Sequence, residues 1–232
     1  MKNKIKKLFG IVFDFFRSRP YSAVLLLWIV QWIWYGVLNH IQTPETSHIM
    51  HSALDDSIPF CEWFIIPYWL WYVYIASALL YTLIKSKKDF LRIVTLVFLG
   101  MFGSLLICTI YPSWHLLRPE TMPDNILSRW VQFTYALDNP AVIFPSMHVL
   151  VAFLISIGLT AAESMKGKTT VKVCCWIYTV IVSASTVFVK QHSIIDVGFA
   201  LLFILPYTLL TYFVIMPKRR FEKTETKQKI AK

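Results

Sequence analysis

Charged residues are scarce in this sequence. Only 16% of its 232 residues are Asp, Glu, Lys or Arg, whereas soluble domains carry about 25%. With 56% apolar residues, the chain has too few polar groups to cover a globular surface. Intrinsic disorder is excluded too, because disordered chains are poor in apolar residues and rich in charge. A protein embedded in a lipid bilayer is the class that remains.

Cysteine and glycine are also rare, with four and seven residues respectively. Four cysteines in an apolar chain of this length do not indicate the disulfide framework of a small secreted domain. Cys61 and Cys108 could still pair outside the membrane, and the sequence leaves this open. Seven Gly and 11 Pro exclude collagen-like and low-complexity folds.

Long apolar runs are what the sequence has in abundance. A membrane-spanning helix needs about 20 apolar residues, and six runs qualify: 21–38, 65–84, 90–111, 148–162, 171–189 and 194–216. The runs are continuously apolar, which excludes the alternating strands of a membrane barrel. The first run resembles a signal peptide but lacks a convincing cleavage site, so we expect a retained anchor.

We therefore predict an all-α, polytopic membrane protein. A six-helix bundle over 21–216 carries the function, between a basic arm at 1–20 and a basic tail at 217–232. The sequence shows no internal repeat and no separate soluble domain.

Basic residues give the predicted bundle an orientation. Twenty of the 23 lysines and arginines fall on one side of it, in four segments: 1–20, 85–92, 163–172 and 217–232. Only Arg118, Arg129 and Lys190 fall on the other side. Because cytoplasmic segments are enriched in Lys and Arg, we predict that both termini are cytoplasmic in the plasma membrane. The net charge of +10 follows from this bias, so nucleic acid is not expected as a partner.

The predicted outward-facing loops are 39–64, 112–147 and 190–193, and ionisable residues gather near their ends. The middles of the spans contain no Asp, Glu, Lys, Arg or His, and Gln31 and Ser104 are typical of their polar residues. Transporters and proton pumps usually place ionisable groups at the membrane midplane. This pattern argues against transport.

The first outer cluster follows the third span and contains His115, Arg118 and Pro119. The enrichment of Lys and Arg in cytoplasmic segments cannot explain an arginine in a loop that is predicted to face outward. Arg118 could simply extend to the interface, or its planar guanidinium could bind a phosphate through two hydrogen bonds.

The second cluster, Pro145-Ser146-Met147-His148, opens the fourth span. Ser146 alone is typical of a helix N-cap, and a single interfacial histidine is usually structural. However, a helix N-terminus is also an anion-binding site, and His148 lies in its first turn.

The third cluster contains Lys190, His192 and Asp196. His192 and Asp196 are four residues apart, so they share one face of a helix. The carboxylate can then hold the imidazole in one tautomer. Three clusters on one membrane face, each suited to phosphate, indicate a phosphoryl site more strongly than any one of them.

These residues resemble the three-part signature of the type 2 phosphatidic acid phosphatase superfamily of membrane lipid phosphatases and phosphotransferases. Arg118-Pro119 matches the end of the first motif, and Pro145-Ser146-Met147-His148 matches the second in full. Ser185, His192 and Asp196 match the third. The six-span layout and the order of the motifs are similar too, over about residues 65–216.

The resemblance implies a role for each residue and no metal or other cofactor. His192 is the nucleophile that forms a phosphohistidine, and Asp196 orients it. His148 protonates the leaving alkoxide and then activates water. Arg118, Ser146 and Lys190 hold the phosphoryl oxygens.

Two positions depart from the signature. Tyr111 stands where the first motif has a lysine, and Thr186 stands where the third has an arginine. We expect Lys190 to replace one of these cations. The shortened motifs also resemble the branch that contains inositol-phosphoceramide and sphingomyelin synthases, which transfer a phospho-headgroup.

The expected function is hydrolysis of a membrane-lipid phosphate monoester or pyrophosphate at the outer face. Phosphatidate, phosphatidylglycerophosphate and undecaprenyl pyrophosphate are candidate substrates. Headgroup phosphotransfer on the same scaffold is the first alternative, and a non-catalytic protein that binds or translocates lipid is the second. The sequence leaves the oligomeric state open.

The 39–64 loop carries a further, weaker pattern. Glu45, His48 and His51 are spaced three apart and would bind a metal if the segment were helical. We favour a solvated or lid-like interfacial segment instead.

Overall fold

The structure is a computed structural model and describes residues 14–217, so the predicted tail and most of the predicted arm lie outside the described residues. In chain order the elements are η1 (Pro20–Leu26), α2 (Leu27–Ile41), η2 (Pro44–Thr46), β1 (His48–Ile49), α3 (Ala53–Ser57), η3 (Glu62–Phe64), α4 (Ile65–Lys85), α5 (Lys87–Ile110), β2 (Ser113–Trp114), α6 (Ile126–Leu137), α7 (Met147–Ala161), η4 (Glu163–Met165), α8 (Thr169–Phe188), α9 (Ile194–Leu209) and η5 (Leu210–Ile215).

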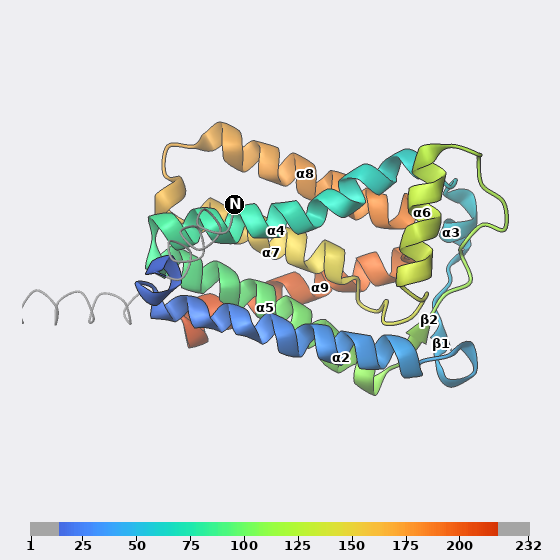
Figure 1. The fold of residues 1–232 in the computed structure, drawn as a ribbon, viewed down its shortest axis with the longest axis horizontal. Helices are drawn as coiled ribbons and strands as arrows, with labels where there is room; N and C mark the ends of the chain where they lie inside the picture. Colours follow the sequence, from blue (N-terminus) through green and yellow to red (C-terminus); the bar gives the residue numbers. More distant parts are fainter. Residues whose placement is uncertain (1–13, 218–232) are drawn as a thin grey trace, which may run out of the picture.

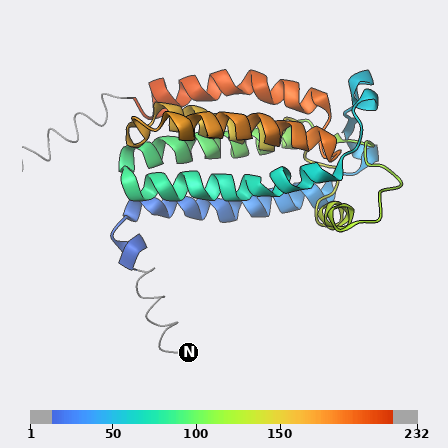
Figure 2. The same cartoon turned by 90° about the horizontal axis from the view of Figure 1, so that it is seen from above.

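Six helices run side by side along the long axis of the molecule: α2, α4, α5, α7, α8 and α9 (Figures 1 and 2). The small elements α3, α6, β1 and β2 gather at one end of this bundle. The described chain starts and stops at the other end. This arrangement confirms the predicted all-α architecture, whereas the six spans and the cytoplasmic termini stay predictions.

Between residues 14 and 217, five helical segments are long and apolar enough to cross a membrane: Pro20–Ile41, Glu62–Lys85, Lys87–Ile110, Thr169–Phe188 and Ile194–Ile215. They coincide with five of the six predicted spans. The remaining predicted span, 148–162, forms α7, which has only 15 residues. Its length of about 22 Å is less than the roughly 30 Å of a hydrocarbon core.

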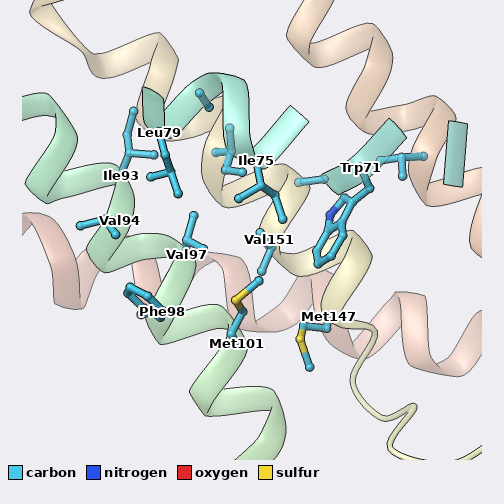
Figure 3. Packing of buried hydrophobic residues seen from close by; sticks show 14 of the residues in the cluster. Trp71, Ile75, Leu79, Ile93, Val94, Val97, Phe98, Met101, Met147 and Val151 are labelled. Carbon is cyan, nitrogen blue, oxygen red and sulfur yellow. The ribbon is translucent and has the colours of Figure 1, made fainter. Parts of the chain in front are cut away.

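The short helix α7 lies in the interior of the bundle, where it packs on α5, α8 and α9. Ten of its 15 residues are buried. Figure 3 shows Val151 of α7 close to Ile75 of α4 and to Val97 of α5. These side chains belong to one cluster of buried apolar residues, which forms the main core.

The outer helices expose apolar side chains instead of burying them. Trp32 and Ile33 of α2, Val180 of α8 and Leu202 of α9 are each more than half exposed. Soluble proteins rarely expose apolar surface of this extent, whereas a bilayer solvates it. The structure is therefore that of a membrane-embedded helical protein.

Two features of the non-spanning segments were not predicted. The 112–147 segment contains the amphipathic helix α6, which lies across the end of the bundle (Figure 1). Asn125 caps it by accepting a hydrogen bond from Ser128 N at 2.8 Å. β1 and β2 form a parallel pair that aligns His48 with Ser113, so the 39–64 and 112–147 segments are joined at this end.

Glycine permits the close approach of α5 and α7. A Cβ atom at Gly158 of α7 would lie 2.7 Å from Cγ1 of Ile93 on α5, and one at Gly100 of α5 would lie 3.0 Å from Leu154 on α7. Small residues allow helix backbones to approach closely in membranes, where van der Waals packing holds helices together.

We expect Gly158→Ala to destabilise the protein by about 1–3 kcal/mol, because the added methyl group overpacks this contact. Gly36 of α2 is the matched control, since no atom lies within 4 Å of its Cβ position. Gly36→Ala should be neutral or mildly stabilising, because alanine favours the helix. Thermal unfolding of the detergent-solubilised variants measures both effects, and equal midpoints would contradict the packing argument.

Candidate active site

The structure brings the two predicted catalytic histidines together. His148 lies in the first turn of α7, and His192 lies just before α9. Their ring centroids are 5.9 Å apart, with the ring planes at 64°. The two rings therefore meet edge to face, and residues 44 positions apart in the sequence lie side by side.

His192 and Asp196 lie next to each other, as their spacing predicts. Nδ1 of His192 is 3.4 Å from Oδ2 of Asp196, within ion-pair distance but not aligned as a hydrogen bond. The same Oδ2 accepts a hydrogen bond from Ser193 N at 2.8 Å. Asp196 is fully buried. The carboxylate therefore faces Nδ1, which leaves Nε2 of His192 for chemistry.

His148 is held between two aromatic rings. Tyr68 stacks on it with ring centroids 4.4 Å apart, and Trp71 lies 4.3 Å away on α4. The Trp71 indole N–H also donates to the His148 carbonyl at 3.1 Å. Within residues 14–217, the His148 Nε2 atom is buried without a hydrogen-bond partner. The ring is thus fixed in place while one nitrogen stays available.

Arg118 lies at the edge of the site, and much of its guanidinium group is already bonded. It donates to the carbonyls of Tyr135 at 3.2 Å and Asp138 at 2.6 Å, and to Oε1 of Gln191 at 2.9 Å. The group also lies 4.2 Å from the centre of the Tyr135 ring. Burial lowers the pKa of Arg118 from its ordinary value. Gln191, which accepts one of these hydrogen bonds, is the residue before His192 in the sequence.

The structure does not bring Lys190 to the other candidate residues. Its ammonium group donates to the carbonyls of Asp55 at 2.9 Å and Ile58 at 2.6 Å. Both carbonyls belong to the α3 region, which folds over this loop. The expectation that Lys190 replaces a missing phosphate-binding cation therefore conflicts with its contacts, and Lys190 instead fastens α3 to the loop before α9.

Ser146 occupies the N-cap position of α7 but does not cap it with its side chain. Its hydroxyl is fully buried and has no partner in the described part of the chain. Its backbone N–H donates to the carbonyl of Asp196 at 3.1 Å. This contact joins the starts of α7 and α9, and it leaves the hydroxyl available to an anion.

Asp55 is the functional neighbour that sequence reasoning missed. Its carboxylate is 1% exposed and accepts three hydrogen bonds: from Ser193 Oγ at 2.6 Å, Ile194 N at 2.8 Å and Ser52 N at 2.8 Å. The spacing of Ser52 and Asp55 is a capping box and could have indicated a helix start. A bond to a residue 138 positions away leaves no such signal.

Asp138 and His115 are two further ionisable residues beside the site. The Asp138 carboxylate accepts a hydrogen bond from the Tyr35 hydroxyl, and burial raises its pKa. Burial first, and the nearby Arg118 charge second, lower the pKa of His115 to about 3. His115 is therefore neutral at physiological pH and adds no positive charge to the site.

An apolar cavity of about 760 Å³ lies between α2 and α4 and reaches the histidines. His148, His192 and Asp138 line one end of it, and Leu83 and Leu25 line it farther along. Nine residues of α4 and three aromatic residues of α2 contribute to its wall. Some of them are more than half exposed, so the cavity is open at the surface between these two helices. A chain-like apolar ligand fits such a space.

The weaker patterns of the sequence do not form sites. His48 stacks on Tyr111 with centroids 3.9 Å apart, and His51 pairs with Asp56 at 2.8 Å. Across residues 14–217, no three His, Cys, Asp or Glu residues form a group that could hold a metal ion. The structure thus contradicts a metal site at Glu45, His48 and His51.

Neither Tyr111 nor Thr186 supplies the positive charge that the signature has at its position. Tyr111 is partly exposed and stacks on His48, and the Thr186 hydroxyl donates to the Ser183 carbonyl. Cys61 and Cys108 are free thiols.

Comparisons with protein-family models, with curated proteins and with solved structures find no match to this chain. The chemistry of the site therefore has to be inferred from its own residues.

The Asp55 contacts lead to a stability prediction with a neighbouring control. Asp55→Asn places an amide N–H₂ against groups that need an acceptor, and we expect a loss of about 2 kcal/mol or more. Asp56→Asn removes only an exposed pair with His51 and should change the melting temperature little. Thermal unfolding of the two detergent-solubilised variants compares them directly. Similar melting temperatures would show that the Asp55 contacts do not hold this end of the bundle together.

The lowered pKa of His115 predicts that the stability of the fold depends on pH. Its folded pKa of about 3 lies below the ordinary value of about 6.5, so below pH 6.5 the unfolded state binds the extra proton. Stability then falls by about 1.4 kcal/mol per pH unit as the pH drops from 6.5 towards 3.

The His115→Gln variant should lose less stability than the wild type between pH 6.5 and pH 4. His51 is the control with the opposite sign, because its hydrogen bond to Asp56 raises its pKa. His51→Gln should not flatten the acid side of the profile. Thermal unfolding midpoints measured between pH 6.5 and pH 4 test this prediction. If the midpoints of the wild type and of His115→Gln fall in parallel, the lowered pKa of His115 does not cause the loss of stability.

Proposed function

We propose that this protein is an integral-membrane lipid phosphatase that acts through a phosphohistidine. The observation that carries the proposal is the 5.9 Å pairing of His148 with His192 at the end of an apolar cavity. The resemblance of the three motifs to the type 2 phosphatidic acid phosphatase superfamily supports it.

The roles that the resemblance implies are compatible with the contacts. Nε2 of His192 attacks the phosphorus while Asp196 faces Nδ1, the bond from phosphorus to the lipid oxygen breaks, and His148 gives its proton to that oxygen. His148 then takes a proton from water, and the resulting hydroxide cleaves the phosphorus–nitrogen bond. Inorganic phosphate leaves and both histidines are restored.

Fewer groups are available to stabilise the charge of the phosphoryl group than the motifs predict. Phosphoryl transfer depends mainly on positioning and charge stabilisation. Since Lys190 bonds to α3, the remaining candidates are Arg118, the Ser146 hydroxyl and the N-terminus of α7, whose first N–H groups have no intrahelical partner.

The proposed orientation places this site at the outer face of the plasma membrane, with both termini cytoplasmic. The described chain starts and stops at the end opposite α3 and α6 (Figures 1 and 2), where the turn between α4 and α5 carries Lys85, Lys87 and Lys88. We propose α7 as the sixth span. Its neighbours bury it, so its length need not match the hydrocarbon core.

Headgroup phosphotransfer is the second candidate, and the apolar cavity favours it. A cavity that accepts lipid chains could also admit a lipid alcohol, which His148 would activate in place of water. The lipid product would then carry the phospho-headgroup, and no inorganic phosphate would be released.

Turnover by the purified protein tests the mechanism. We expect His192→Ala and His148→Ala each to lower phosphate release from phosphatidate in detergent micelles by at least about 10²-fold. His40→Ala, which changes an exposed histidine of α2, should behave like the wild type. Quenching with alkaline detergent after addition of ³²P-labelled substrate should trap a protein-bound phosphate that is stable in base and labile in acid, and that His192→Ala lacks.

Assays with and without a lipid alcohol separate the two reactions, since transfer requires the acceptor. Wild-type turnover in either histidine variant would refute the mechanism. Lipid binding that survives in His192→Ala, together with no trapped phosphate in the wild type, would instead indicate a non-catalytic lipid-binding protein.

A further inference from the structure

The part of the cavity wall that α2 forms contains a polar group that no contact explains. Gln31 is the fifth residue of α2 and lines the cavity together with Trp28, Trp32 and Tyr35 of the same helix. Its side chain is 4% exposed, and its Oε1 atom has no hydrogen-bond partner within the described residues. A buried amide without a partner is unfavourable, so this oxygen indicates a group that occupies the cavity.

The position of Gln31 relative to the site defines that group. Tyr35 is one helical turn nearer the site and donates to Asp138, which lines the same end of the cavity as His148 and His192. Gln31 is about 6 Å farther along α2. A lipid whose phosphate lies between the histidines would place the atoms that link its headgroup to its chains at this depth.

Beyond Gln31 the cavity is lined by apolar side chains. Ile75, Leu79 and Leu83 recur along α4 on the cavity wall, and Figure 3 shows Ile75 and Leu79 on the inner side of this helix near Val97 of α5. The wall is therefore suited to hydrocarbon chains, and the Gln31 amide lies near their polar end.

We propose that Gln31 recognises the linkage region of the lipid and determines which lipid class is accepted. The ligand is a phosphorylated lipid with an ester, amide or hydroxyl group between its phosphate and its chains. A Gln side chain can both donate and accept a hydrogen bond, so it can satisfy any of these. A polyprenyl phosphate has no polar atom at this depth and would leave the amide unsatisfied. The proposal rests on the proposed function for the position of the phosphate.

Three substrate types isolate the role of Gln31. Phosphatidate supplies ester carbonyls, ceramide 1-phosphate supplies an amide and a hydroxyl, and geranylgeranyl phosphate supplies neither. We expect the wild type to prefer the first or the second to the third. In Gln31→Leu, which keeps similar volume, this preference in kcat/KM should fall by about five- to tenfold.

Ser104→Ala is the matched control. Ser104 of α5 is also buried in a span, and its hydroxyl lacks a partner among residues 14–217, but it does not line the cavity. Its removal should leave the ratio between substrates unchanged. Because the readout is a ratio within one protein, loss of folded material does not change it. An unchanged ratio in Gln31→Leu would overturn the proposal.

A binding experiment separates this inference from the proposed function. Native mass spectrometry of the wild-type protein with phosphatidate and geranylgeranyl phosphate in equal amounts measures the same preference without turnover. If no lipid is hydrolysed but Gln31→Leu still lowers the binding preference, the proposed function fails and the recognition site stands. If hydrolysis occurs and both ratios are unaffected, the recognition site fails and the function stands.

Discussion

The contact between the starts of α7 and α9 is the constraint on which the site depends. Ser146 N donates to the Asp196 carbonyl at 3.1 Å, so two helices from distant parts of the sequence begin at the same point. His148 is two residues inside one start, and His192 lies just before the other. A shift of one helical turn, about 5.4 Å, would separate their rings too far to share a phosphoryl group. The burial of α7 against three neighbouring helices resists such a shift.

The two helix starts differ in charge, and this difference indicates where an anion would bind. At α9, the carboxylates of Asp55 and Asp196 already occupy the N-terminal groups. At α7, the first turn contains no acidic residue, and only the unpartnered Ser146 hydroxyl stands beside it. Since a helix N-terminus favours a negative group, the start of α7 is the one that would hold the phosphate under the proposed function. This gives a physical reason why the site could bind phosphate although Tyr111 and Thr186 replace two cations.

Sequence reasoning located the helices well and their contacts poorly. Hydropathy depends on local composition, so five spans and the position of α7 could be predicted, and the spacing of His192 and Asp196 placed them on one face. The burial of α7 was not foreseen from the sequence, since burial depends on neighbouring helices. Lys190 was misjudged for the same reason: nothing local indicates that the carbonyls of Asp55 and Ile58 receive its ammonium group. The amphipathic α6 was not predicted because its residues do not form a long apolar run.

The contacts of Lys190 leave the site with fewer positive charges than the motifs predict. Lys190 and Asp55 together fasten α3 to the loop that carries His192, so the lysine holds this loop in place and does not reach the histidines. The apolar cavity reaches the same histidines from between α2 and α4. A reacting lipid would then have its phosphate between fixed polar groups while its chains stay among apolar side chains. Binding energy from the chains can position the phosphorus, which lessens the need for the cations that the motifs lack.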